Sequence, residues 1–279
     1  MRRFCLAAAI MALAACTPHN PDAEIQAVAC FDEEMSPEDQ IDACSAFLTA
    51  EGMPAIRRAR TLAQRSAAYE GLDDFEHARA DMLAAIALAP NDQPLRQQSA
   101  YFHMREGDNP AAIADLNVAI ARGSNDYLYF VRSQALDDAH DYEGAVADMN
   151  AALRLAPGNA SYLNQRCWIR AKAARDLDMA IADCNRGIAI QSSAAILDSR
   201  GVVRLQLQQF EQALADFEAA LAIEPEEYHS LYGRGIAASH LGRAEDAARD
   251  IAAALAGYPE VAERYASYGI TPFTPPATP

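Results

Sequence analysis

The side chains that could carry catalysis are scattered along this chain. The six histidines form no cluster in the sequence: His19, His77, His103, His140, His229 and His240. Motifs such as HExxH, GxSxG or a phosphate-binding glycine loop are absent from it. His229 and His240 are eleven residues apart, too far on one helix to bind the same metal. The adjacent Asp137 and Asp138 diverge by roughly 100° on a helix and cannot act as an acid/base pair. We therefore expect no enzyme activity, no metal and no cofactor.

The N-terminus instead predicts lipid attachment. Two arginines precede the apolar run FCLAAAIMALAA, as in a signal peptide. Twelve apolar residues are too few for a membrane span, which needs roughly 20. The run ends in Leu13-Ala14-Ala15-Cys16 and resembles the lipobox of bacterial lipoproteins. That resemblance implies cleavage after residue 15 and acylation of Cys16, by palmitate among other chains, which together anchor durably. Thr17 favours the outer membrane, facing the periplasm. An ordinary signal peptide that leaves Cys16 as a free thiol is the alternative.

Composition limits the remaining partners and cross-links. The formal charge is −16, so an acidic surface would repel nucleic acid and anionic lipid headgroups; the charge could also serve only solubility. Cys5 would leave with the signal peptide, and four thiols other than Cys16 would remain. An even number in an oxidising compartment suggests disulfides, with three possible connectivities. The absence of CxxC spacing argues against zinc.

A sequence repeat that occurs six times predicts the secondary structure of most of the chain. Ala-x-x-Asp runs, each followed by a small residue and then Ile or Leu, begin at Ala78, Ala112, Ala145, Ala180, Ala213 and Ala247. A period near 34 indicates a solenoid of helix pairs. Twelve or thirteen residues before each run stands a small residue that lets two antiparallel helices approach closely: Ser66, Ala100, Ser133, Cys167, Gly201 and Gly235. We expect an all-α fold.

These residues, with Pro90, Pro157, Pro225 and Pro259 closing most repeats, resemble the tetratricopeptide repeat. The resemblance implies six helix-turn-helix repeats over 59–258. The expected flanking segments are a signal peptide (1–15), a tether (16–24), a degenerate helical repeat (25–58), a capping helix (259–270) and a Pro-rich tail (271–279). Ser124 and Ser192 stand where two closing prolines are expected, and one extra residue lies near Ala174. The capping helix should cover the last exposed apolar face.

The repeat register pairs several residues. It places Cys167 and Cys184 on facing helices of the fourth repeat, and Cys30 and Cys44 similarly in the degenerate one. We therefore expect Cys30–Cys44 and Cys167–Cys184 disulfides. An arginine precedes the small position in five repeats and matches an aspartate of the second helix: Arg65 with Asp81, Arg132 with Asp148, Arg166 with Asp183, Arg200 with Asp216, and Arg234 with Asp250. We favour a structural role, in which these ion pairs join the two helices of a repeat, over a row of ligand-binding arginines and aspartates. The second repeat breaks the series with Ser99.

In this family ligands lie on the concave face formed by the first helices. The positions that would face this groove include Gln97, Tyr101, Arg105, Tyr127, Phe130, Gln134, Asn164, Trp168, Lys172, Asp198 and Tyr232. Aromatic side chains there supply contact area, as at binding hot spots; packing against the neighbouring helix is the alternative. The resemblance implies a membrane-anchored periplasmic scaffold that binds envelope proteins or peptides. Self-association and, less favoured, glycan or small-molecule binding stay open.

Overall fold

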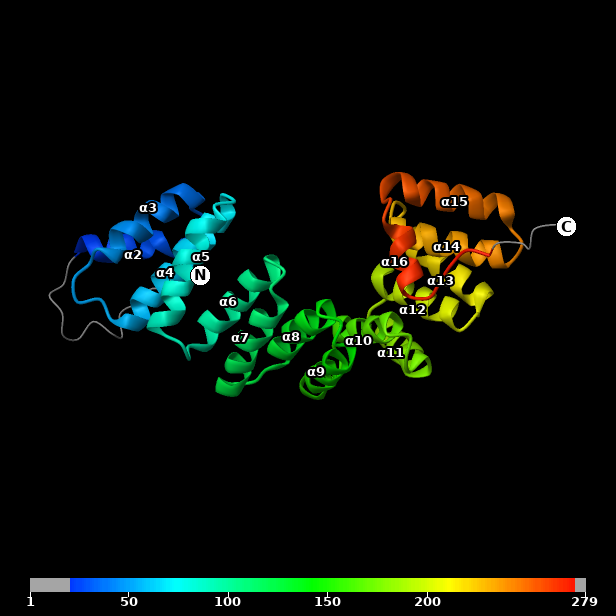
Figure 1. The fold of residues 1–279 in the computed structure, drawn as a ribbon, viewed down its shortest axis with the longest axis horizontal. Coiled ribbons are helices and arrows are strands. Elements are labelled where there is room, and N and C mark those ends of the chain that lie inside the picture. The colour runs from blue at the N-terminus through cyan, green and yellow to red at the C-terminus, as the bar shows by residue number, and fades with distance from the viewer. Residues whose placement is uncertain (1–20, 274–279) are drawn as a thin grey trace. The chain divides into compact units, whose positions relative to one another are not determined.

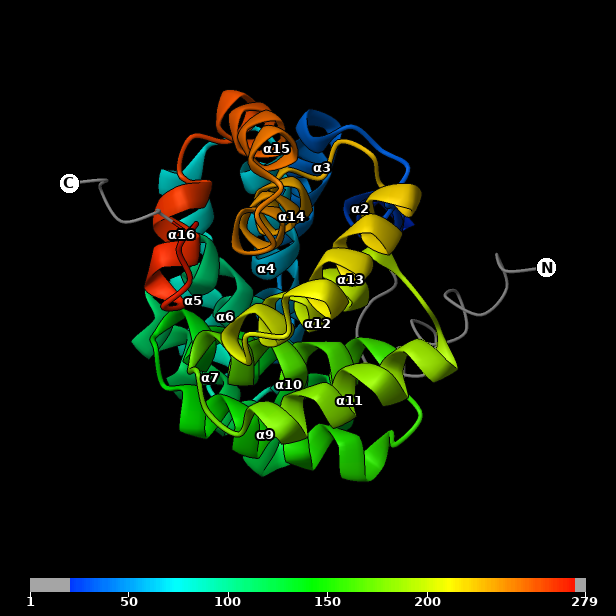
Figure 2. The ribbon, with the colours of Figure 1, turned by 90° about the vertical axis from the view of Figure 1, so that its right-hand side faces the viewer.

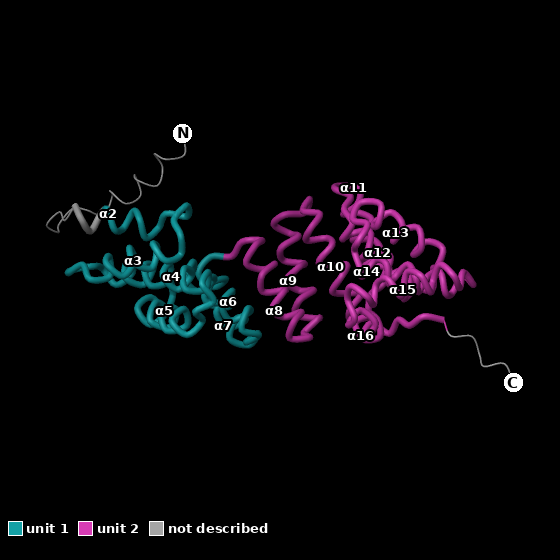
Figure 3. Tube along the Cα trace, turned by 90° about the horizontal axis from the view of Figure 1, so that it is seen from above, with its two compact units in different colours: residues 1–123 teal, residues 124–279 magenta. Residues whose placement is uncertain are grey.

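The computed structural model describes residues 21–273, and every regular element in that part is an α-helix (Figure 1). The all-α solenoid expected from the repeats is thus confirmed. The chain divides into two compact units, residues 1–123 and 124–279 (Figure 3). No helix of the described part is long and apolar enough to cross a membrane. Cys16, the signal peptide and residues 274–279 of the tail lie outside the described residues.

The described part of unit 1, residues 21–123, holds three helix pairs. Its helices are α2 (Pro21–Cys30), α3 (Pro37–Leu48), α4 (Ala55–Gly71), α5 (Phe75–Leu88), α6 (Gln93–Arg105) and α7 (Asn109–Arg122). The α2–α3 pair lies where the sequence predicts a degenerate repeat over 25–58, but α2 begins at Pro21, inside the segment 16–24 that the sequence predicts as a tether. The next two pairs are regular repeats, in which we call α4 and α6 the A helices and α5 and α7 the B helices.

Unit 2 holds four further pairs and a short last helix. Its helices are α8 (Asp126–Asp138), α9 (Tyr142–Leu155), α10 (Ala160–Lys172), α11 (Leu177–Ile190), α12 (Ala194–Gln206), α13 (Phe210–Ile223), α14 (Tyr228–His240), α15 (Ala244–Gly257) and α16 (Val261–Ser267). Here α8, α10, α12 and α14 are the A helices. Figure 2 brings the α14–α15 pair and α16 to the front.

One left-handed residue reverses the chain between the A and B helices of a repeat. Gly107 and Gly242 adopt φ values of 76° and 74°, and Asp73 adopts 58° at the equivalent place. Glycine reaches this region without steric cost, and Asp tolerates it better than most residues. In the first three regular repeats an aspartate then caps the B helix through its side chain: Asp74, Asp108 and Asp141. Sequence turn signals thus correspond to specific backbone conformations.

The fourth repeat has a different turn. Ala174 and Asp176 both have positive φ, 48° and 51°, and the side chain of Asp176 does not cap α11. The sequence shows one extra residue near Ala174, and this second left-handed residue accommodates it. The turn that joins α10 to α11 therefore has two left-handed residues and lacks the side-chain cap found in the first three regular repeats.

Close approach of the two helices in each repeat depends on the small residue of the A helix. Ser66, Ala100, Ser133 and Cys167 are fully buried. A Cβ built on Gly201 would lie 2.7 Å from the Phe217 ring, and one on Gly235 would lie 2.7 Å from Ile251. Backbone and large B-helix side chain therefore meet where the repeat places its smallest residues.

A short helix, α16, lies within the segment 259–270 that the sequence predicts as a cap. It packs on both α14 and α15 (Figure 1). Tyr265 is fully buried, and its ring lies 5.1 Å from the Tyr232 ring and 4.5 Å from the His229 ring, both on α14. The buried Tyr265 side chain thus joins α16 to the A helix α14, since burying an aromatic ring away from water is favourable.

Candidate functional site

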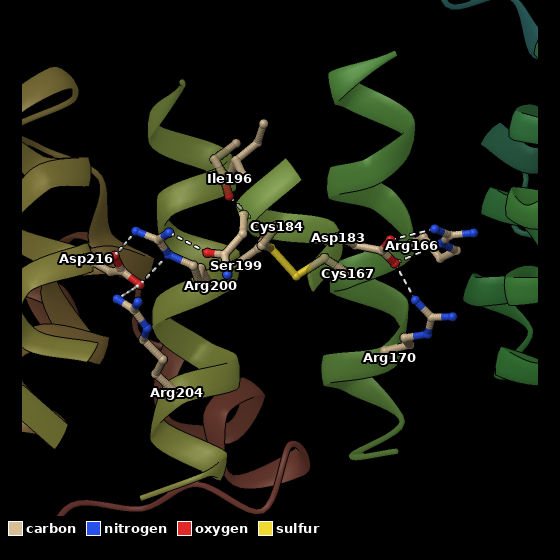
Figure 4. The surroundings of a disulfide bond; sticks show 12 residues. Arg166, Cys167, Arg170, Asp183, Cys184, Ile196, Ser199, Arg200, Arg204 and Asp216 are labelled. Atoms are coloured by element: carbon tan, nitrogen blue, oxygen red, sulfur yellow. Dashed lines mark hydrogen bonds and ion pairs between the residues drawn. A yellow bond between two sulfur atoms is a disulfide. The ribbon is translucent and has the colours of Figure 1, made fainter. Parts of the chain in front are cut away.

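The structure joins both expected cysteine pairs. Cys30 of α2 bonds Cys44 of α3, with an S–S distance of 2.04 Å, and Cys167 of α10 bonds Cys184 of α11 at 2.10 Å. All four residues are fully buried. Figure 4 shows the second disulfide between two clusters of arginine and aspartate side chains. Each disulfide links the two helices of one pair and so serves the scaffold.

The five arginine–aspartate pairs also meet within their repeats. The shortest N–O distances are 2.7 Å for Arg65–Asp81, 2.6 Å for Arg132–Asp148, 2.5 Å for Arg166–Asp183, 2.6 Å for Arg200–Asp216 and 2.6 Å for Arg234–Asp250. Every one of these aspartates is buried, and the guanidinium groups bind through two nitrogens. Such bidentate pairs fix an A helix to its B helix.

Sequence reasoning missed four arginines that bind the buried B-helix aspartates. One of them, Arg249 of α15, lies 3.3 Å from Asp250. Arg170 pairs with Asp183, and Arg204 pairs with Asp216 at 2.6 Å, each one helical turn beyond the expected arginine (Figure 4). In the second repeat Arg96 binds Asp115 from three positions before Ser99, so the series is not broken there. An arginine at i+4 or i−3 from the expected position was the available signal.

In unit 1 the predicted groove residues are Gln97, Tyr101 and Arg105, all on α6. Arg105 forms an ion pair with Glu70 of α4, and its guanidinium lies 5.5 Å from the Phe75 ring centroid. Gln97 and Tyr101 are partly buried. These three residues therefore lie on the same helix, and Arg105 contacts the preceding repeat.

In unit 2 three predicted groove residues lie on α8. Tyr127 is exposed, whereas Phe130 is partly buried and stacks on Tyr162 of α10 with ring centroids 5.1 Å apart. Gln134 is partly buried. The packing alternative thus describes Phe130, and Tyr127 stays accessible.

Two groove predictions are wrong. Tyr232 is only 5% exposed because α16 covers it, so it cannot meet a partner. Lys172 forms an ion pair with Asp137 of α8 and is not a free cation of the groove. Burial raises the pKa of Asp137, and the ammonium of Lys172 opposes that shift. Both errors arose because sequence position gives the face of a helix and not what covers that face.

The remaining predicted residues, Asn164, Trp168 and Asp198, meet at one pocket. It has a volume of about 490 Å³ and lies over the N-terminal halves of α12 and α14, beside the middle of α10. Its lining is Asn164, Gln165, Trp168, Ala194, Ala195, Asp198, Ser199, Glu224, Glu227, Tyr228, His229, Ser230, Tyr258 and Arg264. Carboxylates and aromatic rings predominate among the large side chains. We call it the A-face pocket.

A polar network forms the floor of the A-face pocket. Asp198 accepts a hydrogen bond from the Ser230 hydroxyl at 2.6 Å, and its other oxygen lies 2.9 Å from Nδ1 of His229. Tyr265 donates to the backbone carbonyl of His229 at 3.0 Å. Nε2 of His229 and Oδ1 of Asn164 are buried and have no hydrogen-bond partner among residues 21–273. A bound ligand could satisfy these two atoms.

Electrostatics in this network favour a charged imidazole. Burial would lower the pKa of His229, but the charge and hydrogen bond of Asp198, helped by Glu227, outweigh burial and raise it above its ordinary value of 6.5. Burial raises the pKa of the Tyr265 phenol well above its ordinary range. Tyr265 is therefore a neutral donor.

The network does not have the geometry of a nucleophilic site. The Ser230 hydroxyl bonds Asp198 and not the imidazole, so no base is placed to activate it. Ligand atoms of Asp198, Glu227 and His229 lie within 4.8 Å of one another, close enough to hold a cation. However, Asp198 and His229 bond each other, and Glu227 accepts the backbone N–H of Ser230 as the N-cap of α14. A metal ion would have to displace these internal hydrogen bonds, so we interpret the three side chains as the polar wall of a binding pocket.

The C-terminal halves of the same helices are covered by the chain itself. Gln206 of α12 donates to the Tyr268 carbonyl at 3.1 Å, and Ser239 of α14 accepts from the backbone N–H of Phe273 at 2.9 Å. Nε2 of His240 lies 3.2 Å from the Thr271 carbonyl. Side chains of two A helices thus hold the main chain of a non-helical segment, residues 268–273.

Comparisons with known proteins agree with this architecture. Residues 59–92 and 194–227 match the sequence profile of the tetratricopeptide repeat. No curated protein matches the chain. A tetratricopeptide repeat protein from Parabacteroides merdae shares the fold with a TM-score of 0.71 and 13% identity, over 90% of this chain and all of that one. YrrB, a TPR protein with an unusual peptide-binding site, shares the fold with a TM-score of 0.54 and 17% identity, over 63% of this chain and 91% of that one.

A longer protein is also similar. The Cut9–Hcn1 assembly of the APC/C gives a TM-score of 0.61 with 14% identity over 88% of this chain. This chain spans only 51% of that protein, and the likeness concerns the fold. The helix pairs and these shared folds show an α-solenoid, and two of its repeats match the tetratricopeptide repeat profile.

Proposed function

We propose that this chain is a lipid-anchored scaffold that binds an extended segment of another protein on the A helices of unit 2. The observation that carries the proposal is the contact with residues 268–273. Side chains of Gln206, Ser239 and His240 there bind main-chain groups, which any polypeptide offers. The A-face pocket continues this surface over the N-terminal halves of the same helices and remains open.

The pocket suits a protein ligand better than a reaction. It combines partly buried Trp168 with unsatisfied polar atoms of Asn164 and His229, and both kinds of group gain from contact with a partner. YrrB, a protein with the same fold, is described as having a peptide-binding site. The scaffold proposal extends that property to this chain.

Crosslinking in native membranes tests the proposal. A photo-reactive amino acid would replace Gln165, which lines the A-face pocket, or Glu218, which is exposed on α13 away from it. After irradiation of the lipidated protein, mass spectrometry would identify the adducts. We expect a polypeptide captured from position 165 and not from 218. Adducts only at 218, or none at either position, would contradict binding at the pocket.

The envelope anchor is a separate part of the proposal and rests on the N-terminal sequence. Lipidation of Cys16 would hold the scaffold at the outer membrane, facing the periplasm. Metabolic labelling with an alkyne analogue of palmitate should mark the wild type and not Cys16→Ala, and only the wild type should sediment with outer membranes. Equal labelling of both proteins would refute the anchor.

A further inference from the structure

The A-face pocket offers hydrogen-bond acceptors far more than donors. Oδ1 of Asn164 is buried and has no donor within reach. The carboxylates of Asp198, Glu224 and Glu227 lie in the same lining. Asp198 and Glu227 already accept internal hydrogen bonds, but an ionised carboxylate has about four acceptor sites, so capacity remains. A ligand that fits must therefore bring several donors.

The charges of the pocket lining also favour a ligand that donates hydrogen bonds. The lining holds three carboxylates against one guanidinium, that of Arg264, and the imidazole of His229, which is bound to Asp198. Arg264 lies at the wall formed by Tyr258, 5.5 Å from its ring centroid, and forms no ion pair within the described residues. An anionic ligand would be repelled by the three carboxylates, and an apolar one would displace their water without replacing its hydrogen bonds. A cation gains on both counts.

The aromatic side chains narrow the choice of cation. Trp168, Tyr228 and Tyr258 contribute rings to the lining. A planar guanidinium stacks on such rings while its N–H groups point outward in the plane toward acceptors. An ammonium group is more strongly hydrated and presents no flat face. Arg264 beside Tyr258 is an internal example of this contact.

We propose that the A-face pocket receives an arginine side chain of the bound polypeptide. The inference rests on the proposed function, since it names the residue by which unit 2 would recognise its partner. The guanidinium would lie among Trp168, Tyr228 and Tyr258 and donate to Asn164 and the carboxylates of Asp198 and Glu224.

The test uses three peptides that differ in one side chain. The probes are Ac-Ala-Ala-Arg-Ala-Ala-NH2 and its counterparts with citrulline, a neutral isostere, or lysine. Trp168 is the only tryptophan of the chain and lines the pocket, so its fluorescence reports binding, with calorimetry beside it. EDTA in every titration keeps metal ions away from Asp198, Glu227 and His229. We expect the arginine peptide to bind about tenfold tighter than citrulline, the effect of one charge-assisted hydrogen bond, with lysine between them.

Matched variants separate the pocket from general charge. Glu224→Gln and Asn164→Ala should each weaken the arginine peptide several-fold and leave the citrulline peptide unchanged. Glu218→Gln removes the same charge from the exposed face of α13 and should have no effect. Equal affinity for arginine and citrulline would overturn the inference while leaving peptide binding intact. An equal loss in Glu218→Gln would also overturn it, and binding of no peptide would do so too; crosslinking at position 165 then decides separately on the scaffold.

Discussion

Removing one of the paired arginines should lower the free energy of unfolding by different amounts in different repeats. The loss depends on how many arginines bind the buried aspartate of that repeat. Asp148 is 5% exposed, and Arg132 is its ion-pair partner within the described residues. Asp216 is 3% exposed and binds both Arg200 and Arg204, each at 2.6 Å. Arg132→Met therefore leaves a buried carboxylate with no counter-charge, whereas Arg200→Met leaves one that still holds an arginine.

The magnitudes follow from this difference. Breaking a buried ion pair on one side costs about 3–5 kcal/mol, and the partial exposure of the arginine places Arg132→Met near the lower end, at about 3 kcal/mol. Arg200→Met should cost about 1–2 kcal/mol, because the remaining Arg204 keeps the charge of Asp216 compensated and only the hydrogen bonds of one arginine are lost. Methionine preserves most of the volume of the side-chain stem, so packing changes little.

Urea unfolding followed by circular dichroism would measure both losses. Arg154→Met, an exposed arginine on α9, is the control and should change stability by less than about 0.5 kcal/mol. Adding Asp148→Leu to Arg132→Met should recover most of the loss, since no unpaired charge remains buried. An Arg200→Met variant as unstable as Arg132→Met would refute the idea that Arg204 compensates the charge of Asp216.

Three further changes test other parts of the structure. Cys167→Ala opens a loop of sequence separation 17 and should lower the free energy of unfolding by about 3 kcal/mol in oxidising buffer, a difference that dithiothreitol abolishes. Folding raises the pKa of His229 above 6.5, so its contribution to stability is complete below that pH and is lost as the pH rises through the folded value; wild-type stability should fall more than that of His229→Gln as the pH rises above 6.5, and equal slopes would contradict this. Gly201→Ala forces a Cβ to within 2.7 Å of the buried Phe217 ring and should lower thermal stability by about 1–2 kcal/mol, while Gly158→Ala, with nothing within 4 Å, should not; similar melting curves for the two variants would show that the helices can move apart.

Much of the scaffold was predictable because its determinants recur every 34 residues. The small position at Cys167 and the large one at Cys184 fixed which side chains face each other, so a local register was enough to propose the disulfide. The same register matched Arg200 with Asp216. It could not find Arg204, because the second arginine has no counterpart in every repeat and its role depends on the space beside a particular aspartate.

The binding surface was only partly predictable, for a different reason. Asn164, Trp168 and Asp198 were placed on the correct face by helical periodicity. Tyr232 lies on that face too, but Tyr265 packs on it from a segment more than thirty residues further along the chain. His229 also falls on that face by its position, but its role could not be predicted because the polar network appears only when Asp198 is found beside it.

The sequence by itself determined the repeat, the helix pairs and the partners within each pair, since these contacts join residues at fixed separations. Only the tertiary structure decided which part of the A helices stays open. Residues 261–273 fold back on α12 and α14 because the Tyr265 ring is buried against α14 and the main-chain groups of 268–273 find donors and acceptors on the same helices. The A-face pocket is the part that this segment leaves uncovered.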